Sequence, residues 1–401
     1  MIMTKRVAVI CGYPFPNGLA ATTRIVSYLK GLNEKGAETD AFIYRPTERY
    51  TERTGLPIDG EIDGVRYHYP NTRTYSKYKL LRGLGKYYYY LVACYRIWKE
   101  HKKQKFDFLL ISNDFLDILC LYTFWAKMVG IRPVFITDEY PMPIRVHLHN
   151  DIPKWKKVFY KHILKHEDSL VFMTDKLNTF FNSELKKPYH ILPTITDTSR
   201  FDIEVEPAEK KYMCYMGNME LSKDNVDNII RAFALVSDKY KDIDFNLYGA
   251  PSPKDKAIIE GVIKECNMEQ RVFIKGRVPA TEVPTILKKA YLLVSSQPNT
   301  KRAEGGFPTK LGEYMATGVP TILTDVGEIS QYVKDGVHVH IVPPENPELY
   351  AKKLDWMLSN YDKALDIAVE AKKYLYNTFD YRKVSEGLYN FLNKRTSEKK
   401  K

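Results

Sequence analysis

The sequence predicts an α/β protein built from two Rossmann-like domains that face each other, and two observations carry this prediction. Short apolar runs typical of buried parallel strands alternate with segments of helical spacing in both halves of the chain. A polar stretch without periodicity, residues 193–211, separates the two halves and is typical of a domain boundary. We therefore expect an N-terminal domain over residues 1–195 and a C-terminal domain over residues 210–379.

Length and composition agree with a globular protein of this size. The chain has 401 residues, of which 44% are hydrophobic, so two cores of ordinary size are expected. No apolar run approaches the roughly 18 residues of a membrane-spanning helix, and the apolar residues 7–11 are too few for a signal-peptide core. Five cysteines are scattered singly without zinc-ligand spacing, which favours a reducing compartment and predicts a cytoplasmic protein.

The formal net charge of +12 calls for an anionic partner, and nucleic acid, an anionic membrane face and phosphorylated substrates are the candidates. Residues 76–105 interleave nine lysines and arginines with tyrosines and a tryptophan, against the single acid Glu100. Residues 154–165 place aromatic residues on one helical face and lysines on another. Each segment is interpreted either as a solvated helix with a packed aromatic side or as a contact with an anionic membrane surface.

The N-terminal half opens with a strand, a loop and a helix. Residues 6–11 are expected to form the first strand, residues 12–18 a turn-rich loop placed for a ligand, and residues 20–33 a helix. The loop is not GxGxxG, so the dinucleotide fingerprint is absent. An Asp-Gly turn at Asp63 predicts a hairpin. The other strands of this half are expected at residues 39–44, 106–112, 133–137, 169–174 and 189–192.

The C-terminal half alternates more regularly. Helices are expected over residues 225–239, 254–266, 281–290 and 347–377, with a last helix over 381–393 and a lysine-rich tail. Strands are expected at residues 212–216, 245–248, 272–274, 291–294, 321–324 and 339–342.

Residues 295–325 carry the clearest local signal for a ligand. The segment is expected to form a strand, a loop, a short helix over residues 310–317 and a second strand, with Thr309 as the helix cap. Free amides at the helix start and the charge of Lys310 are suited to an anion. Glu313, one turn further along the helix, can reach a ligand that carries hydroxyl groups. The local alternative is a capped helix of any doubly wound domain. The predicted loop consists of Gly305, Gly306, Phe307, Pro308 and Thr309.

Four segments of the chain, taken in order, resemble the retaining family 4 glycosyltransferases, which have the two-domain GT-B fold. The linker PTITDTSRF is similar to the inter-domain segment of that family. Gly217-Asn218, followed by Lys223, is similar to its Gly-Arg-x4-Lys motif. Residues 272–278 resemble its base-contacting loop, and GGFPTKLGEY resembles a variant of its E-x7-E region.

The resemblance implies transfer of a sugar, with retention, from a UDP- or GDP-linked donor to a saccharide or a polyprenyl-diphosphate-linked saccharide. Such a reaction is typical of cell-surface polysaccharide synthesis, on the inner face of the membrane. The resemblance also implies that the C-terminal domain binds the donor and the N-terminal domain the acceptor. Residues 380–401 would return to the N-terminal domain. Neither a cofactor nor a metal ion is expected, and no DxD-like pair stands out.

Site residues carry over by position. Lys223, Lys310 and the amides of the loop from Gly305 to Thr309 would hold the diphosphate, and Glu313 would bind the ribose hydroxyls. Gly276 and Arg277 would frame the base. In the N-terminal domain, the loop that contains Gly12, Asn17 and Gly18 would lie beside the diphosphate and the acceptor.

The chain departs from the family pattern at three places. Asn218 stands where relatives usually have arginine, and Lys310 would replace the missing charge. Gly305 stands where relatives have the first glutamate of E-x7-E. Asp138 and Glu139 stand where many relatives have histidine, and either carboxylate could meet the sugar or the acceptor hydroxyl. The candidate catalytic residues are therefore Asp138, Glu139 and Lys223.

Three other functions remain open from the sequence. A nucleotide-sugar epimerase shares this fold and needs no acceptor. A nucleic-acid-binding protein would account for the charge and the aromatic residues, but no nucleic-acid module is recognisable, so no nucleic-acid partner is expected. A non-catalytic scaffold would account for the replacements at Asn218 and Gly305.

Overall fold

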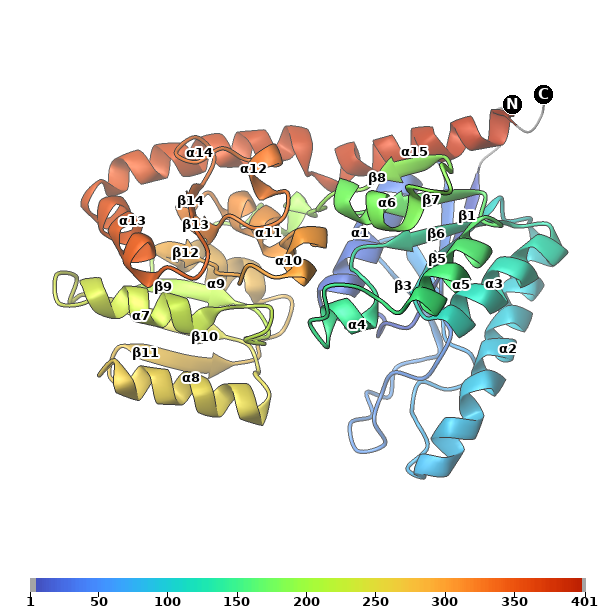
Figure 1. Cartoon of the computed structure of the whole chain (residues 1–401), viewed down its shortest axis with the longest axis horizontal. Helices are drawn as coiled ribbons and strands as arrows, with labels where there is room; N and C mark the ends of the chain where they lie inside the picture. The colour runs from blue at the N-terminus through green and yellow to red at the C-terminus, as the bar shows by residue number, and fades with distance from the viewer. Residues whose placement is uncertain (1–4, 399–401) are drawn as a thin grey trace. The chain divides into compact units, whose positions relative to one another are not determined.

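The computed structural model describes residues 5–398, which form two compact α/β units (Figure 1). Of the described residues, the first unit contains those up to Pro143, the segment Asp151–Ile195 and those from Tyr381 to Glu398. The second contains Ile144–Asn150 and Thr196–Asp380. No helix in the described range is both long and apolar enough to cross a membrane.

The first unit is built on a sheet whose eight described strands run in the order β3-β4-β2-β1-β5-β6-β7-β8. All neighbours are parallel except β3 and β4. Those two form the predicted hairpin, and Asp63 and Gly64 have the positive φ angles, 49° and 76°, that its tight turn requires. The strands are β1 Arg6–Cys11, β2 Glu38–Ile43, β3 Asp59–Ile62, β4 Val65–His68, β5 Phe108–Ser112, β6 Arg132–Thr137, β7 Ser169–Phe172 and β8 Tyr189–Ile191.

Helices cover both faces of this sheet. Alternate residues of β1, among them Val7 and Val9, pack against α1 and the last helix, α15. Helix α2 contacts β2, and helix α3 contacts β5. The helix α15 continues to Glu398, beyond the predicted end at residue 393. The helices are α1 Ala20–Glu34, α2 Lys79–Lys103, α3 Leu116–Val129, α5 Lys154–Leu164, α6 Asp175–Asn182 and α15 Tyr381–Glu398. Helix α4, Met142–Arg145, begins in the first unit and ends in the second.

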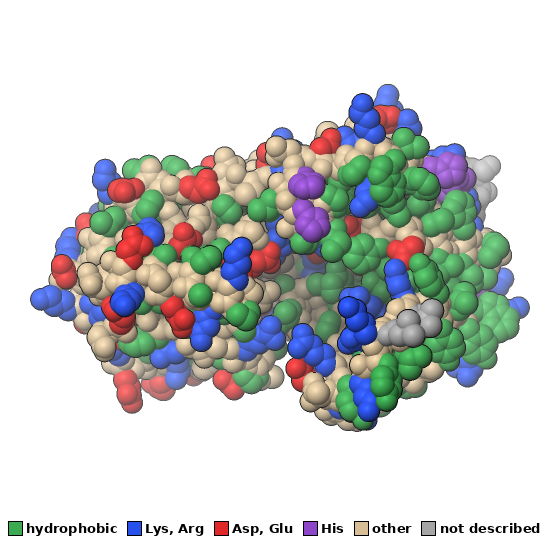
Figure 2. All heavy atoms as spheres, turned by 60° about the horizontal axis from the view of Figure 1, so that its bottom comes forward, with side chains coloured by type: hydrophobic (Ala, Val, Ile, Leu, Met, Phe, Trp, Pro, Cys, Tyr) green, Lys and Arg blue, Asp and Glu red, His purple; other side chains and the backbone are tan. Residues whose placement is uncertain are grey.

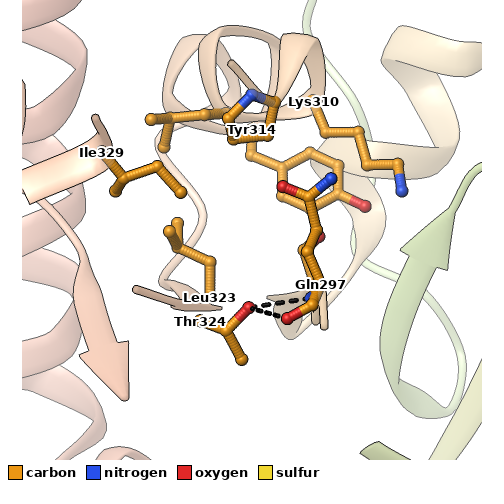
Figure 3. Close-up of a pocket in the computed structure, with 9 residues that line it drawn as sticks. Gln297, Lys310, Tyr314, Leu323, Thr324 and Ile329 are labelled. Carbon is orange, nitrogen blue, oxygen red and sulfur yellow. Dashed lines mark hydrogen bonds between the residues drawn. The ribbon is translucent and has the colours of Figure 1, made fainter. Parts of the chain in front are cut away.

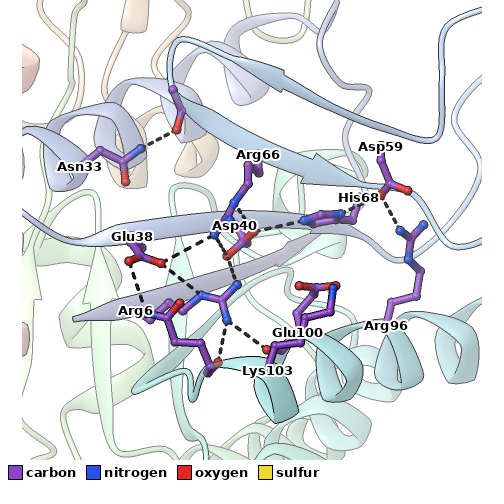
Figure 4. Close-up of polar contacts among 12 residues, drawn as sticks. Arg6, Asn33, Glu38, Asp40, Asp59, Arg66, His68, Arg96, Glu100 and Lys103 are labelled. Atoms are coloured by element: carbon purple, nitrogen blue, oxygen red, sulfur yellow. Dashed lines mark hydrogen bonds and ion pairs between the residues drawn. The ribbon is translucent and has the colours of Figure 1, made fainter. Parts of the chain in front are cut away.

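A buried carboxylate ties the strands of this sheet together (Figure 4). Asp40 on β2, 1% exposed, accepts contacts from Arg6 of β1 (3.0 Å) and from Arg66 (3.0 Å) and His68 (3.1 Å) of β4. Burial alone would raise the pKa of Asp40, but the His68 hydrogen bond and the two arginine charges lower it below its usual value. The network therefore fixes β1, β2 and β4 to one another.

The second unit is built on a parallel sheet whose six described strands run in the order β11-β10-β9-β12-β13-β14. Helices α7, α8 and α13 share a core with β9 and β10, and α11 packs against α9 and α14. The strands are β9 Lys211–Met216, β10 Ile243–Tyr248, β11 Val272–Gly276, β12 Leu292–Val294, β13 Thr321–Thr324 and β14 His340–Val342. The helices are η1 Thr198–Phe201, α7 Val226–Val236, α8 Pro253–Glu265, α9 Val283–Lys289, α10 Lys301–Gly305, α11 Thr309–Thr317, α12 Ile329–Tyr332, α13 Pro347–Ser359 and α14 Tyr361–Thr378.

Two expectations for residues 295–325 were wrong. The short helix α10 was not predicted, and Gly305 is its last residue rather than part of a loop. Thr300 caps this helix, and a Lys301–Glu304 ion pair of 2.6 Å, one turn apart, stabilises it. Thr309 is the first residue of α11 and not its cap. The N-cap position is Pro308, whose side chain makes no capping hydrogen bond.

Candidate active site

In each sheet the strand order reverses at one point, and ligands of open α/β sheets bind outside the carboxyl ends of the strands at such a point. The reversal lies between β1 and β5 in the first unit and between β9 and β12 in the second. In the second unit the loop after β12 is tied to the start of α7, because the N–H of Asn225, the N-cap of α7, donates to the Ser296 carbonyl (2.9 Å) and the Asn228 side-chain amide donates to the Ser296 hydroxyl (3.3 Å).

Lys310 and Asp224 form an ion pair beside this point. The Lys310 ammonium contacts the Asp224 carboxylate and also donates to the Tyr215 hydroxyl (3.0 Å). The side chains of Lys310 and Asp224 are 18% and 3% exposed. Burial lowers the pKa of Lys310, the Asp224 carboxylate opposes this, and the nearby charge of Lys223 lowers it further. The structure thus brings Lys223 and Lys310 together, with Asp224 as a counter-ion that sequence reasoning missed.

Gly217 is required by the close approach of Lys310. A Cβ atom at this position would lie 2.6 Å from Lys310 Cε and 2.5 Å from the Tyr215 hydroxyl oxygen. The following residue, Asn218, is exposed. Backbone hydrogen bonds then join the three loops after β9, β10 and β11, from Gly217 N–H to the Tyr248 carbonyl (2.9 Å) and from Gly249 N–H to the Gly276 carbonyl (2.8 Å). Neighbouring Arg277 is exposed.

Glu313 lies one turn along α11 and is held by Arg200. Glu313 Oε1 accepts a hydrogen bond from Arg200 Nη1 (3.0 Å), and Arg200 Nη2 also donates to the Ala280 carbonyl (3.2 Å). The two side chains are 29% and 26% exposed. Within residues 5–398, Glu313 Oε2 has no hydrogen-bond partner, so one carboxylate oxygen remains for a ligand. The charge of Glu313 also raises the pKa of Lys310, so the two groups are close neighbours.

A small pocket opens between the ends of β12 and β13 and the start of α11 (Figure 3). Pro308 and Lys310 line it from the helix, and Gln297 and Thr324 from the strand ends. The backbone N–H of Gln297 donates to the Thr324 hydroxyl (2.8 Å), which donates back to the Gln297 carbonyl (3.1 Å). Phe307 does not line the pocket, because its ring is 5% exposed and packs on Tyr332 and Phe379, with ring centroids 5.1 and 5.7 Å away. The packing of Phe307 therefore anchors the loop that contains Gly306 to the hydrophobic core.

The unpredicted helix α10 covers the loop after β9. Its Arg302 donates to the Glu220 carboxylate (2.8 Å), and the Arg302 side chain is 12% exposed. Sequence reasoning missed Arg200, Asp224 and Arg302, although Asp224 follows Lys223 directly and Arg200 lies in the recognised linker segment.

In the first unit, the predicted loop follows β1 at the point where the strand order reverses. A Cβ atom on Gly18 would lie 2.4 Å from Thr22 Cβ and 2.6 Å from the Pro14 carbonyl oxygen, so only glycine fits there. Thr22 donates to the Pro14 carbonyl (2.8 Å), and Arg73 donates to the Phe15 carbonyl (2.6 Å). Gly12 begins this braced loop, and Asn17 is exposed on it.

Asp138 and Glu139 follow β6 on the same sheet edge. Asp138 lies 4.0 Å from Arg24 Nε, and their side chains are 35% and 6% exposed. Arg24 is held by the Pro193 carbonyl (2.6 Å) and by the Leu192 carbonyl. Burial lowers the pKa of Arg24, and the Asp138 charge opposes that change. These carboxylates and the Gly12–Gly18 loop belong to the first unit, whereas Lys223, Lys310 and Glu313 belong to the second.

Across the described residues, no group of three potential ligands is placed to hold a metal ion.

Solved structures identify the class of protein that has this fold. Sucrose-phosphate synthase from Thermosynechococcus elongatus has a TM-score of 0.75 over 98% of this chain and 100% of its own, at 15% sequence identity. HepE from Anabaena, in complex with UDP and glucose, has a TM-score of 0.70 over 97% of this chain and 100% of its own, at 12% identity. The chain therefore has the fold of the GT-B glycosyltransferases, as the sequence predicts.

Sequence comparison agrees with the fold. Residues 197–374 match the family described as "Glycosyl transferases group 1". An uncharacterized glycosyltransferase of Methanocaldococcus jannaschii is 22% identical over 302 residues, which cover 74% of this chain and 77% of the relative. The chain thus carries a group 1 glycosyltransferase domain, and it is a glycosyltransferase.

Proposed function

We propose that the enzyme transfers a sugar, with retention, from a UDP- or GDP-linked donor to a saccharide or lipid-linked saccharide acceptor. Cell-surface polysaccharide synthesis is the process that we propose for it. One observation carries the donor assignment. Two cations, Lys223 and Lys310, the amino end of α11 and the carboxylate of Glu313 gather where the strand order of the second sheet reverses. The UDP bound in the similar HepE structure is consistent with such a donor.

In this proposal, Lys223 and the amides at the start of α11 bind the diphosphate. The first amides of a helix lack partners within the helix and attract an anion. Lys310 already has Asp224 as a counter-ion, so it adds less net charge than an unpaired lysine would. In this proposal the Lys310 ammonium packs against Gly217, and its positive charge interacts with both Asp224 and the diphosphate. Glu313, oriented by Arg200, binds the ribose, and Gly276 and Arg277 frame the base.

The chemistry requires charge stabilisation at two places. As the sugar–phosphate bond breaks, negative charge builds on the departing diphosphate and positive charge on the sugar ring. The cations and helix amides stabilise the diphosphate. We assign retention to attack from the same face, guided by the leaving phosphate. Asp138 or Glu139 then orients the acceptor hydroxyl or shares its proton.

The acceptor assignment rests on the outer surface of the first unit, where hydrophobic and basic side chains lie together (Figure 2). On α2, Leu91 and Tyr95 are 62% and 59% exposed, and on α5, Trp155 and Val158 are 56% and 66% exposed. Aromatic rings with lysines between them suit the interface of an anionic membrane. We propose that this surface holds the enzyme at the cytoplasmic face of a membrane that carries its acceptor. Vesicles of anionic phospholipid should retain the protein at low salt and release it at high salt.

The donor assignment is tested by a screen of nucleotide sugars for thermal stabilisation and slow donor hydrolysis. Lys223→Ala should lose most of the stabilisation by the preferred donor, whereas Lys241→Ala, an exposed lysine of the same unit, should not. Equal affinities in the two variants would overturn the site. Conversion of the donor to an isomeric sugar without any acceptor would identify an epimerase instead.

A further inference from the structure

A second cavity lies in the first unit, at the opposite edge of the sheet from the Gly12–Gly18 loop. It has a volume of about 460 Å³ and lies where β6 and β7 begin, whereas that loop follows the carboxyl end of β1. It is lined by side chains from α3, β6, the end of α5, the loop before β7, the loop before β8 and α15. Its basic lining residues are Lys127, Arg132, Lys165, His166, Lys187 and Arg395.

Four of these six basic residues form no ion pair with any residue that the structure describes. Arg395 is paired with Asp168 (3.1 Å) and with Glu398. Arg132 donates to the Arg395 carbonyl (2.9 Å), and the Lys187 ammonium donates to the Lys165 carbonyl (3.1 Å), so neither meets a carboxylate there. Across residues 5–398, no carboxylate lies within ion-pair distance of four of the lining residues, Lys127, Arg132, Lys165 and Lys187.

The remaining acid of the lining does not neutralise them. Glu167 is 1% exposed, and burial raises its pKa to about 8, so the carboxyl group is mostly protonated at neutral pH. Its Oε1 contacts the Thr123 hydroxyl, and its Oε2 has no hydrogen-bond partner among the described residues. A protonated carboxyl group of this kind is itself a donor to an anion.

Part of this charge also has a structural use. Lys127 lies in the last turn of α3, and Lys165 is the C-cap of α5, where positive charges stabilise helix ends. The two helix ends contribute only about half a negative charge each. Arg132 begins a strand and Lys187 lies in a loop, so neither has that function. The cavity therefore keeps an excess of positive charge.

We propose that this cavity binds a phosphate monoester carried by a small organic group, at a site separate from the donor site. Several converging cations suit a dianionic phosphate better than a single carboxylate. The volume is within the usual range of small-ligand pockets and exceeds what a lone inorganic ion fills. The phosphate is carried either by a free sugar phosphate or by the headgroup of a phospholipid such as phosphatidic acid.

The test compares binding by the 401-residue chain and by its double variant, Lys165→Ala with Lys187→Gln. The probes are inorganic phosphate, glucose 6-phosphate, and vesicles of phosphatidylcholine with or without phosphatidic acid, each followed by calorimetry or sedimentation. Lys383→Ala is the matched control, because Lys383 is exposed on α15, lies outside the proposed membrane surface and does not line the cavity. The double variant should weaken the binding of glucose 6-phosphate at least tenfold, and the control should not change it.

Tight binding of glucose 6-phosphate identifies a soluble ligand, and retention by phosphatidic acid vesicles alone, lost in the double variant, identifies a lipid headgroup. Failure of every probe, or equal binding by the double variant and the wild type, would overturn the proposal. UDP binding, measured on the same preparations, should be unaffected by the double variant. The UDP measurement therefore distinguishes a loss of phosphate binding at this cavity from a loss of nucleotide binding at the donor site.

Discussion

The Lys310 ammonium lies against the Asp224 carboxylate, although β10, β11 and β12 separate the two residues along the chain. This pair joins the start of α11 to the loop that precedes α7. The cation beside the proposed diphosphate site therefore already has a counter-ion within the protein. The ion pair should consequently matter for the stability of the second unit as well as for the donor.

Asp224→Asn tests this relationship. The substitution leaves Lys310, only 18% exposed, without its counter-ion, so the free energy of unfolding at pH 7 should fall by roughly 2–4 kcal/mol. The double variant Asp224→Asn with Lys310→Met should recover a large part of this loss, because no unpaired charge remains. Urea unfolding of the single and double variants measures the coupling. Additive losses would show that the pair is energetically unimportant.

Glu313→Ala should weaken the binding of UDP or GDP. Losing a charge-assisted hydrogen bond to the ribose costs roughly 1.5–3 kcal/mol. Arg200→Gln should cause a smaller loss, because Arg200 only orients Glu313. Glu269→Ala, an exposed glutamate of the same unit, provides the control. If calorimetry finds the same nucleotide affinity for Glu313→Ala and this control, Glu313 does not bind the ribose.

Gly31→Ala should destabilise the first unit. A Cβ atom there would lie 2.4 Å from Ser385 Cβ and 2.9 Å from the Tyr381 carbonyl oxygen, so α1 and α15 would have to separate. A loss of about 1–3 kcal/mol in the free energy of unfolding is expected from such overpacking. Gly261→Ala is the control, because α8 leaves open space around that glycine. Thermal unfolding that ranks the two variants equally would contradict this packing.

Glu167 makes stability depend on pH in a particular direction. Its pKa is raised from 4.5 to about 8 in the folded state, so the folded state holds a proton that the unfolded state has released. The free energy of unfolding should therefore fall as pH rises through this window, by at most about 1.4 kcal/mol per pH unit from this group. Glu167→Gln should flatten that part of the profile, whereas Glu269→Gln should not. A steeper profile for Glu167→Gln would refute the assignment.

Most helices and strands could be predicted from the sequence, whereas the long-range side-chain contacts of the site could not. The hairpin at Asp63-Gly64 was predictable because its turn type requires positive φ angles at both positions. Helix α10 was missed because Gly305 and Gly306 were interpreted as a loop, whereas the Thr300 cap and the Lys301–Glu304 pair stabilise a short helix. The contacts of Lys310 with Asp224 and of Glu313 with Arg200 join distant segments, and no local pattern specifies such pairs.

The packing of α15 against α1 has a consequence for synthesis of the protein. Leu388 and Leu392 belong to the same buried cluster as Val9 and Leu29, although they follow the whole second unit in the chain. The N-terminal sheet therefore cannot complete its core as it emerges, and one face must wait until the second unit has been translated. During that interval an apolar surface is exposed to other nascent chains and to chaperones.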